Sequence, residues 1–246
     1  MSNQREDSKK HSNIKDTNIN QSYLHLIQIH DSAFPSGNFA HSFGMETYIQ
    51  EDDIRNEEDL KVFCEMYLRH NFASGDAIFA KEAYRLAKER DLDGLIKLEN
   101  ICHAVKLSPE TREGSLMMGR QFTRTIKPLV EDEFMSLWLE KFKNKEVKNH
   151  YSVVYGIYTA IIGVSAKMSL ETFLYSSITA LVLNAVRAVP VGQMSGVKTV
   201  HSMLPIIEEV ANDVMGYGLE DLDNNSIALE ISSMKHEFLN SRLFIS

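Results

Sequence analysis

Apolar residues recur at intervals of three and four along almost the whole chain, the spacing that places them on one face of an α-helix. Alternation of apolar and polar residues, the pattern of a half-buried strand, is not convincing anywhere. The pattern therefore predicts an all-α protein built from a bundle of about ten helices. The predicted helices cover 24–34, 42–51, a stretch after Asn56, a stretch after Ser74 to Asp76, 92–107, 109–125, 131–143, 152–164, 169–188 and 195–215, with a short one within 226–246.

Local start and stop residues support several of these boundaries. Asn56 is followed by three acidic residues, which favour the positive end of a helix dipole. Ser108 precedes Pro109, the combination expected of an N-cap and a first helical position. Pro190 ends the 169–188 helix, and Pro205 should kink or restart the 195–215 helix. An acidic loop over 216–225 follows.

The domain organisation is predicted to be simple. Residues 1–20 are polar and charged, without an apolar core, and we expect a disordered N-terminal arm. Neither a repeat nor an interdomain linker interrupts 21–240, which we expect to form one all-α domain. Residues 241–246 are expected to form an exposed C-terminal tail.

Composition excludes several classes of protein. The formal net charge is −8 and no basic stripe is visible in the sequence, so nucleic-acid binding is disfavoured. The two cysteines, Cys64 and Cys102, lie singly on helical stretches and are expected to be buried thiols in a reducing, cytoplasmic compartment. The apolar stretch 170–189 is long enough to span a membrane, but Glu171, Asn184 and Arg187 interrupt it. A core helix is the better interpretation.

Catalytic motifs are incomplete. The segment 192–199 resembles a phosphate-binding loop, but its glycines are one residue too close, Val197 separates Gly196 from the lysine, and the loop follows a helix. His236 opens a zinc-protease-like run in which Asn240 stands where a second histidine is needed. The sequence gives no positive reason to expect an enzyme. For His41, a hydrogen-bonding or partner-facing role is favoured over metal ligation.

Four separated blocks, in order, resemble the UreF family of urease accessory proteins. They are Asp31–Glu46 with its continuation to Ile49; Ser108–Glu113 with Met118 and Gly119; His150–Gly156 with Phe173–Tyr175 and Asn184–Gln193; and Met234–Ser246. The first and last blocks are the more specific. Ser152 stands where the family usually has proline, and Ser195 replaces a common acidic residue.

The resemblance implies a noncatalytic, dimeric, all-α protein. Members of this family bind the accessory protein UreD, also called UreH, and the complex recruits the GTPase UreG and docks on apo-urease. Nickel and GTP are handled chiefly by these partners, so no intrinsic cofactor or resident metal is expected. The expected role is that of a scaffold and gate for nickel delivery. The residues expected to bind partners are Phe39, His41, Tyr175, Arg187, Pro190, Gly192, Gln193, Arg242, Leu243, Phe244 and Ser246.

Other readings of these residues stay open. Arg187 lies in an apolar helix and fits either an internal ion pair or an interface, and Tyr175 either the core or an interface. The apolar tail is predicted to dock on UreD/UreH without contributing to stability, the alternative being that Leu243 and Phe244 fold back onto their own domain. A homodimer is predicted because the apolar residues Leu170, Phe173, Leu174, Leu181 and Leu183 supply more apolar surface than one helix face can bury within a single bundle.

Two alternative functions also stay open. One is a helical metal-dependent hydrolase with a His/Glu site assembled in space around His41, His150 and His236. The other is a nickel-storage protein, against which the lack of a histidine-rich tract weighs.

Overall fold

The computed structural model describes residues 21–37, 40–189, 191–223, 227–239 and 241–245. Within these ranges the chain forms helices and no strands, which confirms the all-α prediction. A helix over 21–30 comes first. The remaining helices are α2 (Met45–Gln50), α3 (Glu57–Tyr67), α4 (Asp76–Lys88), α5 (Leu92–Val105), α6 (Pro109–Ile126), α7 (Glu133–Lys143), α8 (Tyr151–Ile162), α9 (Ala166–Ala188), α10 (Gln193–Met215) and α11 (Ile227–His236). Three short turns of other helix types cover Leu68–Phe72 (η2), Lys127–Leu129 (η3) and Leu219–Asp221 (η4).

The predicted capping residues start their helices. The Asn56 side chain accepts hydrogen bonds from the backbone of Glu58 and Asp59 at the start of α3. Ser108 caps α6 by accepting from Thr111, and Pro109 is the first helical residue. In contrast, α10 continues through Pro205 as one helix and does not restart there. These caps are local interactions, which explains why the sequence located the boundaries.

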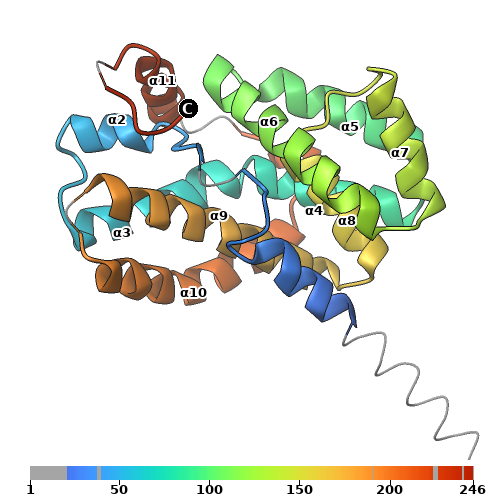
Figure 1. Ribbon diagram of the computed structural model, residues 1–246, viewed down its shortest axis with the longest axis horizontal. Helices are drawn as coiled ribbons and strands as arrows, with labels where there is room; N and C mark the ends of the chain where they lie inside the picture. The colour runs from blue at the N-terminus through green and yellow to red at the C-terminus, as the bar shows by residue number, and fades with distance from the viewer. Residues whose placement is uncertain (1–20, 38–39, 190, 224–226, 240, 246) are drawn as a thin grey trace, which may run out of the picture.

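The helices are arranged around α4 (Figure 1). Helix α4 packs against α8, α5 and α9, while α10 packs against α9 and α3. Helices α4 and α8 approach closely at Gly156 of α8, where a Cβ atom would lie 2.2 Å from the carbonyl oxygen of Ala80. Only a residue without a side chain permits this distance, so α4 and α8 are joined backbone to backbone. One contiguous hydrophobic core extends from Leu26 to Leu229.

Helix α9 is long and apolar enough to cross a membrane, but 56% of its most apolar window is buried inside the bundle. Its buried side chains include Leu170, Phe173, Leu174 and Leu181. The prediction of a core helix agrees with this packing. The same burial removes most of the argument for a homodimer, because of the five residues it used only Leu183 is exposed. Both cysteines are free and buried, as expected.

Candidate functional site

The C-terminal end of the chain lies against α2, so that the first and fourth of the characteristic blocks meet (Figure 1). The carboxylate of Glu46 accepts backbone hydrogen bonds from Leu243 at 2.7 Å and Phe244 at 3.2 Å. The N–H of Ile245 donates to the carbonyl oxygen of Ala40 at 2.8 Å. The tail is therefore bound through its backbone to residues nearly two hundred positions earlier.

A buried charged cluster supports this arrangement. His236, at the end of α11, lies with Nε2 2.8 Å from Glu46 and Nδ1 2.8 Å from Glu110. The second carboxylate oxygen of Glu110 lies 3.5 Å from the guanidinium of Arg242. His236 is fully buried, with a carboxylate facing each of its ring nitrogens. The two carboxylates, from α2 and α6, therefore hold the end of α11 from both sides.

Helix α11 is held on α2 and α6 by small polar side chains. Thr47 donates to the Ser232 carbonyl, and Ser232 donates to the Gly44 carbonyl. Gly44 has a φ of 86°, and a Cβ there would lie 3.0 Å from the Ser233 nitrogen. A glycine is required on both counts, because the left-handed conformation and the close approach each disfavour a side chain.

The tail presents its side chains in two directions. The Phe244 ring is 6% exposed, with the Arg187 guanidinium 5.7 Å from its centroid. Leu243 is 66% exposed and Ile245 is also exposed. The alternative that the tail folds back thus holds for Phe244 but not for Leu243. Arg187 is exposed at the end of α9, and its guanidinium lies over the Phe244 ring of the tail.

The other residues expected at interfaces are placed differently. His41 is almost fully buried, burial lowers its pKa to about 4, and its carbonyl accepts from the Asn184 side chain. His41 therefore lies inside the protein beside α9, and it offers no surface to a partner. Tyr175, Gly192 and Gln193 are exposed, whereas Phe39, Pro190 and Ser246 lie outside the described residues.

The exposed apolar side chains of helix α11 and of the tail form a candidate binding surface, of which the sequence analysis identified only the tail part. We refer to it as the C-terminal surface; its side chains, all exposed, are Ile227, Ile231, Met234, Phe238, Leu243 and Ile245. Phe238 is 80% exposed, which is exceptional for a phenylalanine. The four-residue spacing of Ile227 and Ile231 along the helix was the available sign.

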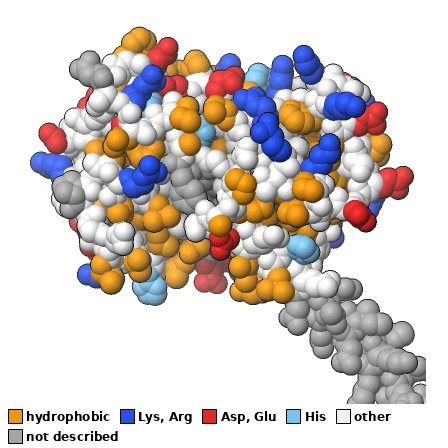
Figure 2. Space-filling model, viewed as in Figure 1, with side chains coloured by type: hydrophobic (Ala, Val, Ile, Leu, Met, Phe, Trp, Pro, Cys, Tyr) orange, Lys and Arg blue, Asp and Glu red, His pale blue; other side chains and the backbone are white. Residues whose placement is uncertain are grey.

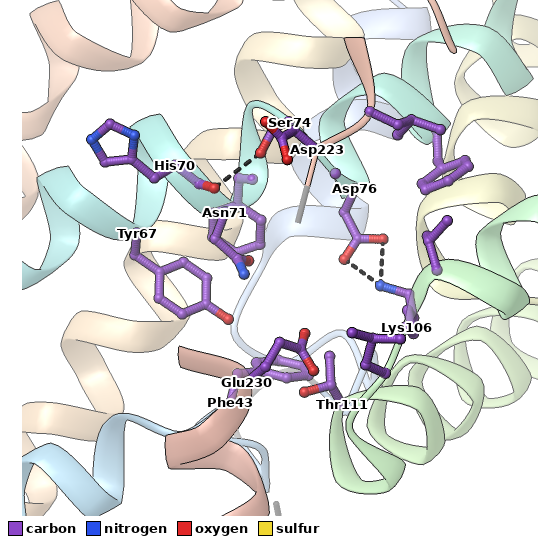
Figure 3. Close-up of a pocket in the computed structure, with 16 residues that line it drawn as sticks. Phe43, Tyr67, His70, Asn71, Ser74, Asp76, Lys106, Thr111, Asp223 and Glu230 are labelled. Atoms are coloured by element: carbon purple, nitrogen blue, oxygen red, sulfur yellow. Dashed lines mark hydrogen bonds and ion pairs between the residues drawn. The ribbon is translucent and has the colours of Figure 1, made fainter. Parts of the chain in front are cut away.

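A pocket of about 330 Å³ lies behind α11, lined by α11, α4, η2 and the start of α6 (Figure 3). Across it the Lys106 ammonium bonds both Asp76 oxygens, at 2.8 and 2.9 Å. Burial raises the pKa of Asp76, but Lys106 outweighs that effect and holds it below its usual range. The Tyr67 hydroxyl points into the same pocket, and burial, with Asp76 and Glu230 nearby, raises its pKa well above the ordinary value. The remaining lining combines polar side chains with apolar ones such as Phe43, Phe72 and Phe79.

A second buried polar cluster lies at the start of α8. His150 pairs its Nε2 with Nδ1 of His103 and its Nδ1 with the Ser115 hydroxyl, each at 3.0 Å. Its backbone N–H donates to Glu99 at 2.8 Å. Burial lowers the pKa of His150 to about 3 and raises that of Glu99 to about 7. The cluster joins α5, α6 and α8, and its outer member, His103, is half-buried.

The histidines proposed for a hydrolase site therefore serve three different networks. The His41 carbonyl accepts a hydrogen bond from Asn184 of α9, His150 lies in the cluster that joins α5, α6 and α8, and His236 bridges Glu46 and Glu110. Among the residues that the structure describes, no group of three or more His, Cys, Asp or Glu side chains could hold a metal ion. No observation favours a metal-dependent hydrolase or a storage site.

Comparison with known proteins identifies the family to which this chain belongs. The sequence model of the UreF family matches residues 54–204. The urease accessory protein UreF of Sporosarcina pasteurii is 70% identical over 202 residues, which is 82% of this chain and all of that protein. The chain belongs to the UreF family. The urease accessory protein UreF of Bacillus sp. (strain TB-90) is 33% identical over 223 residues, covering 91% of this chain and 98% of its own length. The first and fourth blocks, which carry the most specific part of the resemblance to UreF, are the ones that the contact between Glu46 and the tail brings together.

Proposed function

We propose that this UreF protein is a noncatalytic accessory protein of urease maturation in the cytoplasm. It acts as a scaffold and gate in the complex that delivers nickel to apo-urease, binds the accessory protein UreD/UreH and recruits the GTPase UreG. Nickel and GTP are handled chiefly by those partners, and the chain needs no cofactor of its own. Membership of the family, together with two relatives named as urease accessory proteins, supports the role in maturation.

The observation that carries the binding proposal is the C-terminal surface. Its exposed side chains include Leu243, Ile245 and Phe238. The backbone beneath the first two is already fixed by Glu46 and Ala40. A prefolded apolar segment loses little conformational entropy on binding, so more of its burial energy appears as affinity. We assign this surface to UreD/UreH.

The test replaces the exposed tail residues and spares the buried one. In the double variant Leu243→Asp with Ile245→Asp, co-expressed with UreD/UreH, we expect an unchanged melting temperature, loss of co-purification, and urease that is present but poor in nickel and inactive. A matched control, Val62→Asp with Leu24→Asp, changes two exposed apolar residues elsewhere and should co-purify normally. Normal co-purification of the tail variant would refute the assignment.

A homodimer is a separate part of the proposal. Helices α9 and α10 expose Leu183, Met194 and Val197 near the Gly192–Gln193 turn, and Tyr175 is exposed earlier on α9. We propose that a second copy covers these side chains. Sedimentation at micromolar concentration should show a dimer for the native chain and a monomer for Leu183→Glu. A native chain that sediments only as a monomer would contradict this part.

A further inference from the structure

A groove of about 590 Å³ separates the second half of α6 from α7, far from the C-terminal surface in sequence. Arg120, Arg124 and Lys127 line one wall at spacings of four and three, and Lys143 stands on the other. Figure 2 shows basic side chains gathered on the face over these two helices. The sequence analysis found no basic stripe; this prediction was wrong, because the stripe forms only when the helical spacing of α6 is combined with a residue of α7.

The positive charge of the groove is poorly neutralised. Glu140 is the one acidic side chain among its lining residues, against four basic ones. Arg120 lies 4.0 Å from Glu113, at the limit of an ion pair. For Arg124, Lys127 and Lys143, the described residues provide no ion pair, although the whole chain carries a net charge of −8. An excess of like charge in an acidic protein is unfavourable on its own and becomes favourable against a negative partner.

The floor of the groove is not fully polar. Leu139 and Phe142 are half-buried, and they lie between the basic walls. Nucleic acid would satisfy the charges but would leave these apolar side chains uncovered, and the acidic remainder of the surface would repel it. A helix with acidic residues on its flanks and apolar residues facing the floor satisfies both features.

We propose that the α6–α7 groove binds an acidic amphipathic helix of a partner protein. Carboxylates one turn apart on that helix pair with Arg120, Arg124 and Lys127, whose own spacing is one helical turn. Arginine forks bind carboxylates with two parallel hydrogen bonds, which fixes the register of the incoming helix. The site is distinct from the tail and does not depend on the proposed role in nickel delivery.

The experiment uses a defined probe and the full-length protein. A fluorescent 14-residue helical peptide carries glutamate on its flanks and leucine on one face, and a matched peptide has glutamine in place of each glutamate. We expect the glutamate peptide to bind more than tenfold more tightly than the glutamine peptide at low salt, with affinity falling as salt rises. The double variant Arg124→Glu with Lys127→Glu should lose at least tenfold in affinity and should bind a lysine version of the peptide instead.

Controls separate a local site from net charge. The variant Arg55→Glu with Lys97→Glu makes the same change of charge at two exposed residues outside the groove and should bind the glutamate peptide as the native protein does. Lys143→Glu, on the opposite wall, tests the groove with an independent substitution, and circular dichroism verifies that each variant is folded. Equal affinity for the glutamate and glutamine peptides, or an equal loss of affinity in the control variant, would overturn the proposal.

Discussion

The Nε2 atom of His236 lies 2.8 Å from the carboxylate of Glu46 across 190 residues of sequence. The same carboxylate accepts the backbone N–H groups of Leu243 and Phe244, so it joins α2, α11 and the tail at one point. A buried carboxylate needs such partners, because its desolvation is otherwise unfavourable. Docking of the tail and placement of α11 are therefore coupled through one side chain.

Glu46→Gln should loosen the tail and α11 together. The amide keeps one acceptor oxygen but turns its NH2 group toward donors, which leaves one buried hydrogen bond unmade. We expect a loss of about 1–3 kcal/mol in the free energy of unfolding. Hydrogen exchange should show faster exchange at the Leu243 and Phe244 amides. Glu51→Gln, which breaks only the exposed pair with Lys235, should change stability by less than about 1 kcal/mol. Unchanged exchange at the tail amides in Glu46→Gln would contradict the coupling.

Phe244→Ala should lower stability, whereas the exposed tail residues should not affect it. The Phe244 ring is buried beneath Arg187, and removing a buried aromatic ring costs about 3–5 kcal/mol in a core, with the lower end expected at a chain end. Deleting 242–246 should then also lower the melting temperature, unlike the neutral deletion that the sequence suggested. Denaturant unfolding of Phe244→Ala beside Leu243→Ala makes the comparison, and equal stabilities would show that the ring contributes nothing.

The helices were predictable because their caps and apolar faces are encoded by near neighbours. Asn56 and Ser108 cap the helices they precede, and the interruption at Ser74–Asp76 is a break before α4. The tail contact was not predictable in this way. Glu46 lies near the start of the chain and Phe244 near its end, and nothing in the spacing of either segment names the other as partner. A glutamate at the start of an amphipathic helix is equally typical of a solvent-exposed side chain and of a buried one.

The burial of individual side chains was the second feature that could not be predicted from the sequence. Glu99 occupies a position that looks like any exposed acid on a helix, yet it is fully buried beside His150. Similarly, Phe173 and its apolar neighbours on α9 suggested an interface, although α10 and α4 cover them within the chain. Whether an apolar face meets its own chain or another depends on the packing of distant helices.

Pro205→Ala should stabilise the protein. Pro205 lies inside the continuous helix α10 and is exposed, so it removes a backbone hydrogen bond without contributing to the core. A proline in a helix interior is about 3 kcal/mol less favourable than alanine, and a gain of about 1–3 kcal/mol is expected. Thermal unfolding measures it, with the exposed Leu204→Ala as the neighbouring control. A decrease in stability would mean that α10 requires the geometry that proline imposes.

Glu99 should make stability fall as pH rises through the neutral range. Burial raises its pKa to about 7 from an ordinary value of 4.5, and backbone donors at His150 and Asn149 only partly offset this. Between these values the folded protein holds a proton that the unfolded chain has released, so raising the pH favours unfolding. The buried histidines act in the opposite direction, since burial lowers the pKa of His41 to about 4.

The effect of Glu99 on stability is therefore best isolated as the difference between the Glu99→Gln variant and the native chain. Relative to the native chain, Glu99→Gln should gain about 2 kcal/mol more stability at pH 8 than at pH 5. Urea unfolding at both values measures the difference, and Glu140→Gln, at an exposed position, should show none. A pH-independent difference for Glu99→Gln would show that Glu99 stays ionised in the folded protein over this whole range.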